Sequence, residues 1–273
     1  MTTILLTGAT DGIGRQTAFD LVERGAKLVI HGRSREKLER VASELEARRA
    51  GSVVASLAAD LSRLDEVRRL AADAAAIVPG VDVLLGNAGV FMNERVVTSD
   101  GYEASFAVNH LAHLLLAQLL LPTLRSSSDG RVVFVASVAH QRGRMDFDDY
   151  HFEKSPYGAY EAYARAKLAN VMTAAELARR VGGSPAVFSL HPGVVSTKLL
   201  KDGFGMQGPD SHEEGAATSV HLALDPGVRA HSGRYFVKKA LAATNPIVDD
   251  AAATARLYED SCRMLGLEPL PLP

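Results

Sequence analysis

The stretch TILLTGATDGIG, residues 3–14, decides the expected fold of this chain. It begins with a short run of apolar and β-branched residues, which is typical of a buried strand. Glycines follow at Gly8, Gly12 and Gly14, and a helical pattern begins near residue 13. Glycine permits a tight turn and a close approach to a pyrophosphate, while a helix N-terminus offers free N–H groups and a positive dipole end. The order strand, glycine loop, helix therefore predicts a dinucleotide-binding unit rather than a purely structural turn.

The rest of the chain repeats the alternation of short apolar runs and longer amphipathic stretches. Strands are expected at residues 2–6, 27–31, 53–57, 82–86, 131–137, 186–190 and 234–237. Helical patterns lie near residues 13–24, 34–50, 62–77, 100–124, 160–182, 212–224 and 249–265. This alternation predicts an α/β, doubly wound Rossmann fold with a mainly parallel seven-stranded sheet and helices on both faces. No linker or repeat interrupts it, so residues 1–273 are expected to form a single domain.

Two stretches, residues 138–159 and 198–211, break this rhythm, and both directly follow strands. In open α/β sheets, ligands bind beyond the carboxyl ends of the strands. We therefore expect both stretches to be substrate-side loops. Their apolar and aromatic residues would give the cleft an apolar cover: Phe147, Phe152, Tyr157, Leu199, Leu200, Phe204 and Met206.

The composition excludes several classes of protein. The chain has 273 residues, 47% of them hydrophobic, and a formal net charge of −2, whereas a nucleic-acid-binding protein would show a basic face. The single cysteine, Cys262, fits a reducing compartment. The longest apolar run, Leu111–Leu121, is too short and too polar to span a bilayer. We expect a cytoplasmic protein with no transmembrane anchor and no nucleic-acid partner, and a homo-oligomer is compatible with this composition.

The glycine spacing, G-x-x-x-G-x-G, resembles the cofactor loop of the short-chain dehydrogenases/reductases. Segments after the third, fourth and sixth strands resemble the same family, although Gly86 departs from an asparagine in its pattern. The resemblance implies a nicotinamide dinucleotide cofactor, with Asp60 near the adenine and Thr197 at the nicotinamide carboxamide. The full set of implied cofactor residues on these segments is Gly8, Thr10, Asp11, Gly12, Ile13, Gly14, Asp60, Leu61, Asn87, Ala88, Gly89, Pro192, Gly193, Val195 and Thr197.

Longer segments resemble one branch of this family, the retinol-dehydrogenase-like branch, which includes protochlorophyllide-reductase-like and WW-domain oxidoreductases. The segments are VNHLAHLLLAQLL (108–120), SVAHQRGRMDFDD (137–149), AYARAKLANV (162–171) and HPGVVSTKL (191–199). The resemblance implies an oxidoreductase of alcohols and carbonyl compounds, and the expected apolar cover of the cleft favours a small hydrophobic substrate over a sugar.

The spacing Tyr-x-x-x-Lys, which this family uses for catalysis, occurs three times, at Tyr150, Tyr163 and Tyr235. The family places a catalytic serine at the end of the fifth strand, where Ser137 stands. In many members the tyrosine follows that serine closely, which would select Tyr150. However, Pro156 lies just beyond the lysine of that pair, and proline disfavours a helix there.

Tyr163 instead begins a long helical pattern, and a helix holds residues four apart on one face. Tyr235 lies in an expected strand, where residues four apart are far from each other. We therefore predict that Tyr163 and Lys167 form the catalytic pair. Ala166 departs from the serine that usually precedes the lysine.

The predicted chemistry is the transfer of a proton by Tyr163. A free phenol has a pKa of about 10, so a nearby ammonium from Lys167 should help to stabilise the phenolate. Ser137 would hydrogen-bond to the substrate oxygen. By resemblance, Lys167 and Tyr163 also contact the cofactor, and Asn109 helps to route the proton from Lys167 through water. Alternatively, Asn109 caps or kinks its helix.

The end of the second strand predicts the choice of cofactor. It reads His31-Gly32-Arg33, with no carboxylate before Glu36. An acid there would bind the ribose 2′-hydroxyl of NAD, whereas Arg33 offers a planar fork to a 2′-phosphate. NADP(H) is therefore expected in preference to NAD(H), unless Arg33 merely points to solvent.

Three histidines and two other classes of function are the alternatives to this interpretation. His110 and His113 are three residues apart, but no further ligands suggest a metal site. His140 is a candidate for the substrate pocket, with an uninvolved loop histidine as the alternative. The leading function is an NADP(H)-dependent oxidoreductase, and the alternative is a non-catalytic NADP(H)-binding sensor or scaffold. A nucleotide-sugar epimerase would need a larger substrate domain.

Overall fold

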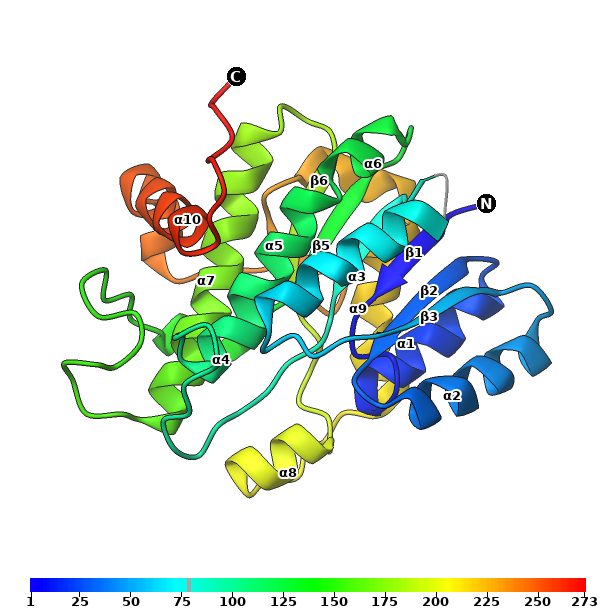
Figure 1. Ribbon diagram of the computed structural model, residues 1–273, viewed down its shortest axis with the longest axis horizontal. Coiled ribbons are helices and arrows are strands. Elements are labelled where there is room, and N and C mark those ends of the chain that lie inside the picture. The colour runs from blue at the N-terminus through cyan, green and yellow to red at the C-terminus, as the bar shows by residue number, and fades with distance from the viewer. Residues whose placement is uncertain (78–79) are drawn as a thin grey trace.

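The computed structural model describes residues 1–77 and 80–273, and its centre is one twisted sheet (Figure 1). Within the described chain the strands are β1 (Thr3–Leu6), β2 (Lys27–Gly32), β3 (Val53–Ala58), β4 (Val83–Gly86), β5 (Arg131–Val135), β6 (Ala186–His191), β7 (Tyr235–Val237) and β8 (Ala240–Leu241). They lie in the order β3-β2-β1-β4-β5-β6-β7-β8, and all neighbours are parallel except β7 and β8. The predicted doubly wound α/β fold is confirmed.

Helices cover both faces of this sheet. The longer ones are α1 (Gly12–Glu23), α2 (Arg35–Arg48), α3 (Leu64–Ile77), α5 (Ala112–Leu119), α7 (Ala159–Arg180), α9 (His212–Leu224) and α10 (Ala251–Met264). The shorter ones are α4 (Ala104–Phe106), α6 (Leu121–Ser126), α8 (Lys198–Phe204), a π-helical turn η1 (Ala107–Leu111), and the 3₁₀ turns η2 (Val138–Arg142), η3 (Pro226–His231) and η4 (Pro246–Asp249).

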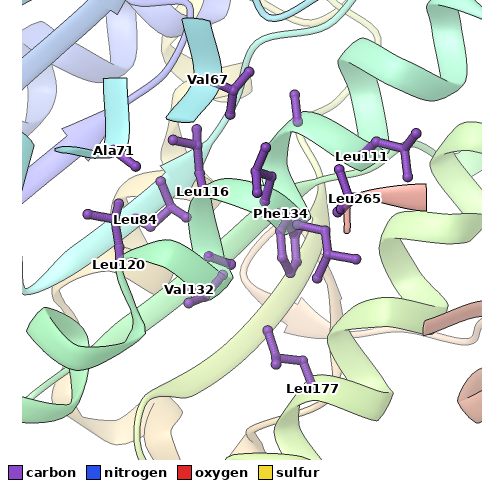
Figure 2. Close-up of a cluster of buried hydrophobic side chains, with 14 of the residues drawn as sticks. Val67, Ala71, Leu84, Leu111, Leu116, Leu120, Val132, Phe134, Leu177 and Leu265 are labelled. Atoms are coloured by element: carbon purple, nitrogen blue, oxygen red, sulfur yellow. The ribbon is translucent and has the colours of Figure 1, made fainter. Parts of the chain in front are cut away.

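Two apolar cores follow from the two-sided burial of the strands. One face of the sheet packs against α1, α2 and α9. The other packs against α3, α5, α7 and α10. Figure 2 shows part of this second core, where Leu84, Val132 and Phe134 of the sheet meet Leu116 of α5 and Leu177 of α7. Such side chains are completely or almost completely buried, and burying each contributes about 1.5–3 kcal/mol relative to leaving it exposed.

The prediction of seven strands was wrong by one, because β8 returns antiparallel to β7. The connection consists of Lys238 and Lys239, both with positive φ, at 49° and 65°. Two-residue turns of this kind are normally built from asparagine and glycine. A pair of lysines carries no such signal, so the hairpin could not be recognised from the sequence.

Two further elements differ from the expectation. The helix expected over residues 100–124 is interrupted at η1, the π-helical turn that contains Asn109. The stretch 198–211, expected to be a loop, begins with α8, which Thr197 caps at its N-terminus and Gly205 ends in the left-handed region, at φ 61°. In Figure 1 α8 stands apart from the helices that cover the sheet.

The sheet brings the predicted motifs to one edge. In a parallel sheet, the carboxyl ends of the strands lie together. The glycine loop follows β1, Asn87 follows β4, Ser137 lies two residues beyond β5, and Pro192 follows β6 directly. The strand order reverses between β1 and β4, and such a switch point is where open sheets of this type bind dinucleotides.

Candidate active site

The glycine loop has the backbone that the sequence predicts. Gly8 and Gly12 have φ of +69° and +51°, a region that side chains strongly disfavour. Gly14 is needed for another reason, because a Cβ there would lie 2.1 Å from the carbonyl O of Gly8. The Asp11 carboxylate accepts a hydrogen bond from the Gly12 N–H at 2.8 Å and caps α1. The other N–H groups in the first turn of α1 have no acceptors within the helix, because no helical turn precedes them. They point towards the glycine loop.

Thr7 and Asn87 join the glycine loop to the segment after β4. The Asn87 side-chain amide donates to the carbonyl O of Thr7 at 2.9 Å. In return, the Thr7 hydroxyl accepts the backbone N–H groups of Asn87 and Ala88 at 2.9 and 3.0 Å. The structure thus brings together Gly8, Asn87 and Ala88, as predicted. Thr7 was not predicted as a site residue, although it directly precedes the glycine loop.

The far end of the predicted cofactor site lies beyond β2 and β3. Asp60 accepts hydrogen bonds from the backbone N–H and hydroxyl of Ser62, at 2.9 and 2.8 Å, and Leu61 is buried. Arg33 is exposed, and no carboxylate forms a salt bridge with it within the described residues. Its guanidinium is therefore available to an anion at this end of the site.

His31 is a buried residue that the sequence analysis did not assign to the site. Its Nδ1 accepts the Gly8 N–H at 3.4 Å, and its Nε2 donates to the carbonyl O of Ala59 at 3.0 Å. Burial lowers its pKa to about 4, so the ring is neutral at physiological pH. The neutral ring supports the glycine loop through its bond to Gly8. A histidine inside an otherwise apolar strand was the available signal.

The catalytic candidates meet where α7 crosses the end of β5. Tyr163 and Lys167 lie one helical turn apart, with the Lys167 Nζ 5.6 Å from the centre of the Tyr163 ring. Ser137 lies near enough to Tyr163 to lower the pKa of its hydroxyl. The Lys167 Nζ donates to the carbonyl O of Val135 at 2.8 Å. Ser137, Tyr163 and Lys167 are therefore brought together as the sequence predicted.

Burial controls the charges of this cluster. It raises the pKa of Tyr163 to about 12, against the smaller opposing effect of the Ser137 side chain. It lowers the pKa of Lys167 to about 7, because the ammonium is taken out of water. The sequence analysis expected the ammonium to help stabilise the phenolate, but in the protein alone the cost of burial is larger. Near neutral pH Lys167 is therefore poised between its charged and neutral forms, while Tyr163 remains protonated.

Asn109 occupies the π-helical turn, so it does interrupt its helix. Its side-chain O accepts the Val90 N–H at 2.8 Å, and its side-chain N donates to the carbonyl O of Val90 at 2.9 Å. A Cβ on Gly89 would lie 3.0 Å from the Asn109 Oδ1 and 3.5 Å from the Lys167 Nζ. Asn109 thus borders Lys167 while it holds the segment after β4.

Comparison with known proteins decides the family. The family model described as short chain dehydrogenase matches residues 2–207. The chain belongs to the short-chain dehydrogenase family. Retinol dehydrogenase 13 of Homo sapiens is 36% identical, over 97% of this chain and 85% of that protein. A Streptomyces protein to which a daunorubicin C-13 ketoreductase activity is attributed is 38% identical, over 97% of this chain and 92% of that protein.

Solved structures agree with this assignment. An uncharacterised protein of Mycobacterium paratuberculosis matches with a TM-score of 0.82 and 32% identity, over 100% of this chain and 96% of that chain. A short-chain dehydrogenase of Escherichia coli, solved with NADPH, matches with a TM-score of 0.72 and 27% identity, over 88% of this chain and 97% of that chain. The protein is therefore an oxidoreductase of the short-chain dehydrogenase type, which acts on CH–OH or C=O groups, in the retinol-dehydrogenase-like branch.

In this dehydrogenase the segment after β6 closes over the glycine loop. Gly193 has φ +108°, and a Cβ there would lie 2.8 Å from the Asp210 carboxylate, which accepts the Val194 N–H at 2.7 Å. A Cβ on Gly12 would lie 3.2 Å from the Thr197 methyl group. The Thr197 hydroxyl accepts the N–H of Leu200 at 3.3 Å and so caps α8. Its contact with a nicotinamide carboxamide stays a prediction.

An aromatic wall stands against the family's tyrosine. The Phe91 and Phe204 rings lie 5.6 and 5.4 Å from the Tyr163 ring and 4.5 Å from each other, measured between centroids. Tyr160 and Leu199 pack on the same group. Leu199 and Phe204 were predicted to cover the cleft. Phe91 and Tyr160 were missed, because nothing in their sequence spacing relates them to α8.

Other predicted apolar cover residues lie elsewhere. Phe147 packs against Tyr150 and beneath Arg256. Phe152 packs beneath the guanidinium of Arg165, 3.9 Å from ring centre to Cζ. These parts of the 138–159 stretch belong to packing interactions that do not include Tyr163.

The two rejected tyrosines have structural surroundings. Tyr150 lies in a turn, and its hydroxyl donates to the Asp260 carboxylate at 2.7 Å. Burial and that carboxylate raise the pKa of Tyr150. Tyr235 is buried in β7, 4.5 Å from the His140 ring in an edge-to-face arrangement.

His140 is completely buried, which bears on its predicted place in the substrate pocket. Its Nδ1 donates to the carbonyl O of Ser137 at 2.6 Å. Since the ring has no exposed surface, any influence on a substrate would pass through Ser137.

Residues 1–77 and 80–273 hold neither a cluster of metal ligands nor a helix that could cross a membrane. Those residues contain no group of three or more histidine, cysteine, aspartate or glutamate side chains placed to hold a metal ion. His110 instead bonds through Nε2 to the Ser261 hydroxyl at 2.9 Å. Within the same residues, every helix is too short or too polar for a bilayer crossing.

The residues at this edge of the sheet fit a dinucleotide. Gly8 and Gly12 hold a backbone that leaves no side chain between the loop and a pyrophosphate, and the N-terminus of α1 opens onto that loop. Arg33 is exposed at one end of the edge, and Lys167 lies beside Gly89 at the other. A diphosphate between two nucleosides has matching partners along this line.

Proposed function

We propose that the protein is an NADP(H)-dependent oxidoreductase that interconverts a hydrophobic alcohol and its carbonyl compound, with Tyr163 as general acid and base. The observation that carries the proposal is the cluster of Ser137, Tyr163 and Lys167 beside the glycine loop. A sensor or scaffold would have no need of a buried lysine without a carboxylate partner. Burying a charged group costs free energy, and catalysis is a reason to bear it.

The proposed chemistry divides between the cofactor and the chain. A bound nicotinamide supplies or accepts the hydride. In alcohol oxidation Tyr163 takes the hydroxyl proton, and in carbonyl reduction it gives a proton to the oxygen. Ser137 hydrogen-bonds to the same oxygen and stabilises its developing charge. Lys167 favours the phenolate form of Tyr163 whenever its own nitrogen is charged.

The choice of NADP(H) rests on Arg33. Its exposed guanidinium stands just beyond β2, where an enzyme that uses NAD has an acid. A charge-assisted hydrogen bond to a 2′-phosphate contributes about 1.5–3 kcal/mol, or about 10- to 150-fold in affinity. The NADPH complex of the Escherichia coli dehydrogenase supports the same choice.

We expect Arg33→Gln to raise the Kd for NADPH by about 10- to 150-fold and to leave the Kd for NADH nearly unchanged. The difference in the Kd for NADPH between this variant and the unmodified protein should shrink at high ionic strength, because salt screens an exposed charge. Arg40→Gln, an exposed arginine further along α2, is the matched control. Titrations of NADPH fluorescence measure both constants, and NADH binding as tight as NADPH in the unmodified protein would refute the assignment.

A carboxylate at residue 32 is a poor way to reverse this preference. A Cβ on Gly32 would lie 2.7 Å from the Thr10 methyl group, so the substitution would also disturb the glycine loop. The charge at residue 33 is therefore the cleaner variable.

The proposed substrate is apolar because of the aromatic wall around Tyr163. Phe91 and Phe204 present rings to the catalytic tyrosine, and Leu199 packs beside them. The names of the two relatives refer to an alcohol, retinol, and to a ketone. Large apolar alcohols, aldehydes and ketones are thus the compounds to test first.

The experiment that tests the function is a turnover assay. The purified protein is mixed with NADPH and a panel of apolar aldehydes and ketones, and with NADP⁺ and the matching alcohols. Consumption of NADPH that depends on a carbonyl compound is the expected result. Tight NADPH binding without turnover of any compound would favour the sensor or scaffold instead.

A further inference from the structure

His113 is a buried histidine that the proposed reaction does not use. It lies in α5, is 1% exposed, and has hydrogen bonds at both ring nitrogens. Its Nε2 lies 2.9 Å from the Thr7 hydroxyl. Its Nδ1 lies 3.1 Å from the carbonyl O of Asn109. One ring therefore touches both the loop after β1 and the turn that carries Asn109.

The hydrogen positions in this chain of bonds can be deduced. The carbonyl O of Asn109 can only accept, so the Nδ1 of His113 carries the proton. The Thr7 hydroxyl already accepts two backbone N–H groups, from Asn87 and Ala88. Its own hydrogen must therefore be donated, and the Nε2 of His113 is the nearer acceptor, since the carbonyl O of Leu85 lies at 3.4 Å. Burial lowers the pKa of His113 to about 4, which keeps the ring in this neutral form.

The two hydrogen-bond partners of His113, Thr7 and Asn109, belong to different parts of the site. Thr7 fixes the segment at Asn87 and Ala88, beside the glycine loop. Asn109 holds both backbone polar groups of Val90 and borders Lys167 across Gly89. Its carbonyl O also accepts from the Asn170 side chain at 3.0 Å, on the same helix as Lys167. His113 is thus the side chain that spans the cofactor loop and the catalytic lysine's surroundings.

Gly86 makes room for the ring. A Cβ at residue 86 would lie 3.0 Å from the Cδ2 and 3.1 Å from the Cγ of His113. Gly86 is the position where the chain departs from an asparagine of the family pattern. The glycine lets the imidazole lie directly against the end of β4.

We propose that His113 is a positioning residue that links the cofactor loop to Asn109. The Thr7 bond holds the loop in the shape that binds the dinucleotide. The Asn109 bond holds the turn that borders Lys167. The second part rests on the proposed oxidoreductase function, whereas the first concerns cofactor binding alone.

Two substitutions separate the two bonds. In His113→Asn, the amide nitrogen can take the place of the Nδ1 and keep the bond to Asn109, but the side chain is too short to reach Thr7. In His113→Gln, the longer side chain can present its oxygen to the Thr7 hydroxyl, but it lacks the donor to Asn109. His113→Phe retains the ring shape and loses both bonds.

We expect His113→Asn to raise the Kd for NADPH by about tenfold, the effect of one buried hydrogen bond, and to change kcat by less than about twofold. We expect the reverse for His113→Gln, with the Kd nearly unchanged and kcat about tenfold lower. His113→Phe should show both losses. NADPH fluorescence gives the Kd, and the carbonyl compound that turns over best in the panel gives kcat.

A measurement that needs no turnover separates the positioning role of His113 from the proposed oxidoreductase function. The Val90 amide is protected by the Asn109 side chain, so its hydrogen exchange should be faster in His113→Gln than in His113→Asn. If no compound turns over, the proposed oxidoreductase function fails. The order of the variants in their Kd for NADPH, and in the exchange rate of the Val90 amide, still tests the role of His113. Equal effects of Asn and Gln on both readouts, or no effect of Phe on either, would overturn the link.

Discussion

Two regions of this molecule carry the same spacing of tyrosine and lysine, and they differ in everything around it. Tyr150 and Tyr163 are each 7% exposed. Tyr150 lies in a turn and donates to the Asp260 carboxylate, while its lysine, Lys154, donates to the carbonyl O of Asp148. Tyr163 lies on α7 with Lys167 one turn away.

The difference is electrostatic. A carboxylate beside a phenol stabilises the protonated form, whereas an ammonium stabilises the phenolate. Burial raises the pKa of both phenols. At Tyr150 the Asp260 carboxylate raises it further, against Arg256 and Arg263, whereas the cation beside Tyr163 is Lys167, 5.6 Å from the ring centre. Equal spacing and equal burial thus lead to a structural hydrogen bond at one tyrosine and to a candidate proton carrier at the other.

The largest expected effect is the loss of turnover in Tyr163→Phe. The ring and its packing remain, but the exchangeable proton is gone, and general acid and base catalysis contributes about 10²- to 10⁴-fold. NADPH should still bind, which fluorescence titration checks. Tyr150→Phe should keep its activity within about twofold. Full turnover in Tyr163→Phe together with its loss in Tyr150→Phe would reverse the assignment of the two tyrosines.

This comparison also shows how far the sequence could predict the site. The backbone of Gly8 and Gly12 and the positions of Ser137 after its strand and of Tyr163 and Lys167 on one helix could be predicted, because glycine backbone, strand ends and helix periodicity are local properties. The doubly wound, mainly parallel sheet was predicted from the alternation of strands and helices.

Other features depended on contacts between distant residues. Phe91 packs against both Tyr163 and Phe204 of α8, and a helix over residues 198–204 was not predicted. The bonds of His113 to Thr7 and Asn109 join β1 to α5, and no spacing in the sequence encodes them. The sign of the Tyr163 shift depended on burial, which a sequence does not measure.

The prediction of intermediate size concerns how the rates of alcohol oxidation and carbonyl reduction change with pH. Burial lowers the pKa of Lys167 to about 7 and raises that of Tyr163 to about 12. Loss of one proton from the pair leaves chiefly the neutral pair, with a small share of the ion pair of phenolate and ammonium, and these titrate as a unit. Alcohol oxidation needs the phenolate, whose small share grows as the pair loses its first proton, so its rate should rise with pH through this ionisation. Carbonyl reduction needs the Tyr163 proton and should fall only at higher pH, where that proton is lost.

Lys167→Met sharpens the test, because the phenol then titrates alone. The rise in oxidation should move to higher pH by about one unit or more, the usual effect of a neighbouring charge. Lys154→Met, the matched change in the other pair, should leave the profile in place. Initial rates between pH 6 and 10, with hydride transfer shown to limit them by deuterium substitution, provide the measurement. A flat profile in the unmodified enzyme would contradict the role of the pair.

The smallest expected effect is on stability, and it uses the third tyrosine as a control. Tyr150→Phe removes a hydrogen bond to Asp260 and should lower the free energy of unfolding by about 0.5–1.5 kcal/mol, which corresponds to a melting temperature lower by about 1–6 °C in a protein of this size. The loss should stay within that range because Asp260 keeps a partner, Arg263, at 2.8 Å. In Tyr235 the buried hydroxyl has no hydrogen-bond partner within the described residues, so Tyr235→Phe should cost less than Tyr150→Phe or even stabilise the fold. Thermal unfolding of the two variants in parallel decides the matter. A larger loss in Tyr235→Phe would show that the Tyr235 hydroxyl has a partner, such as a bound water, and that the Tyr150 bond contributes less than its geometry indicates.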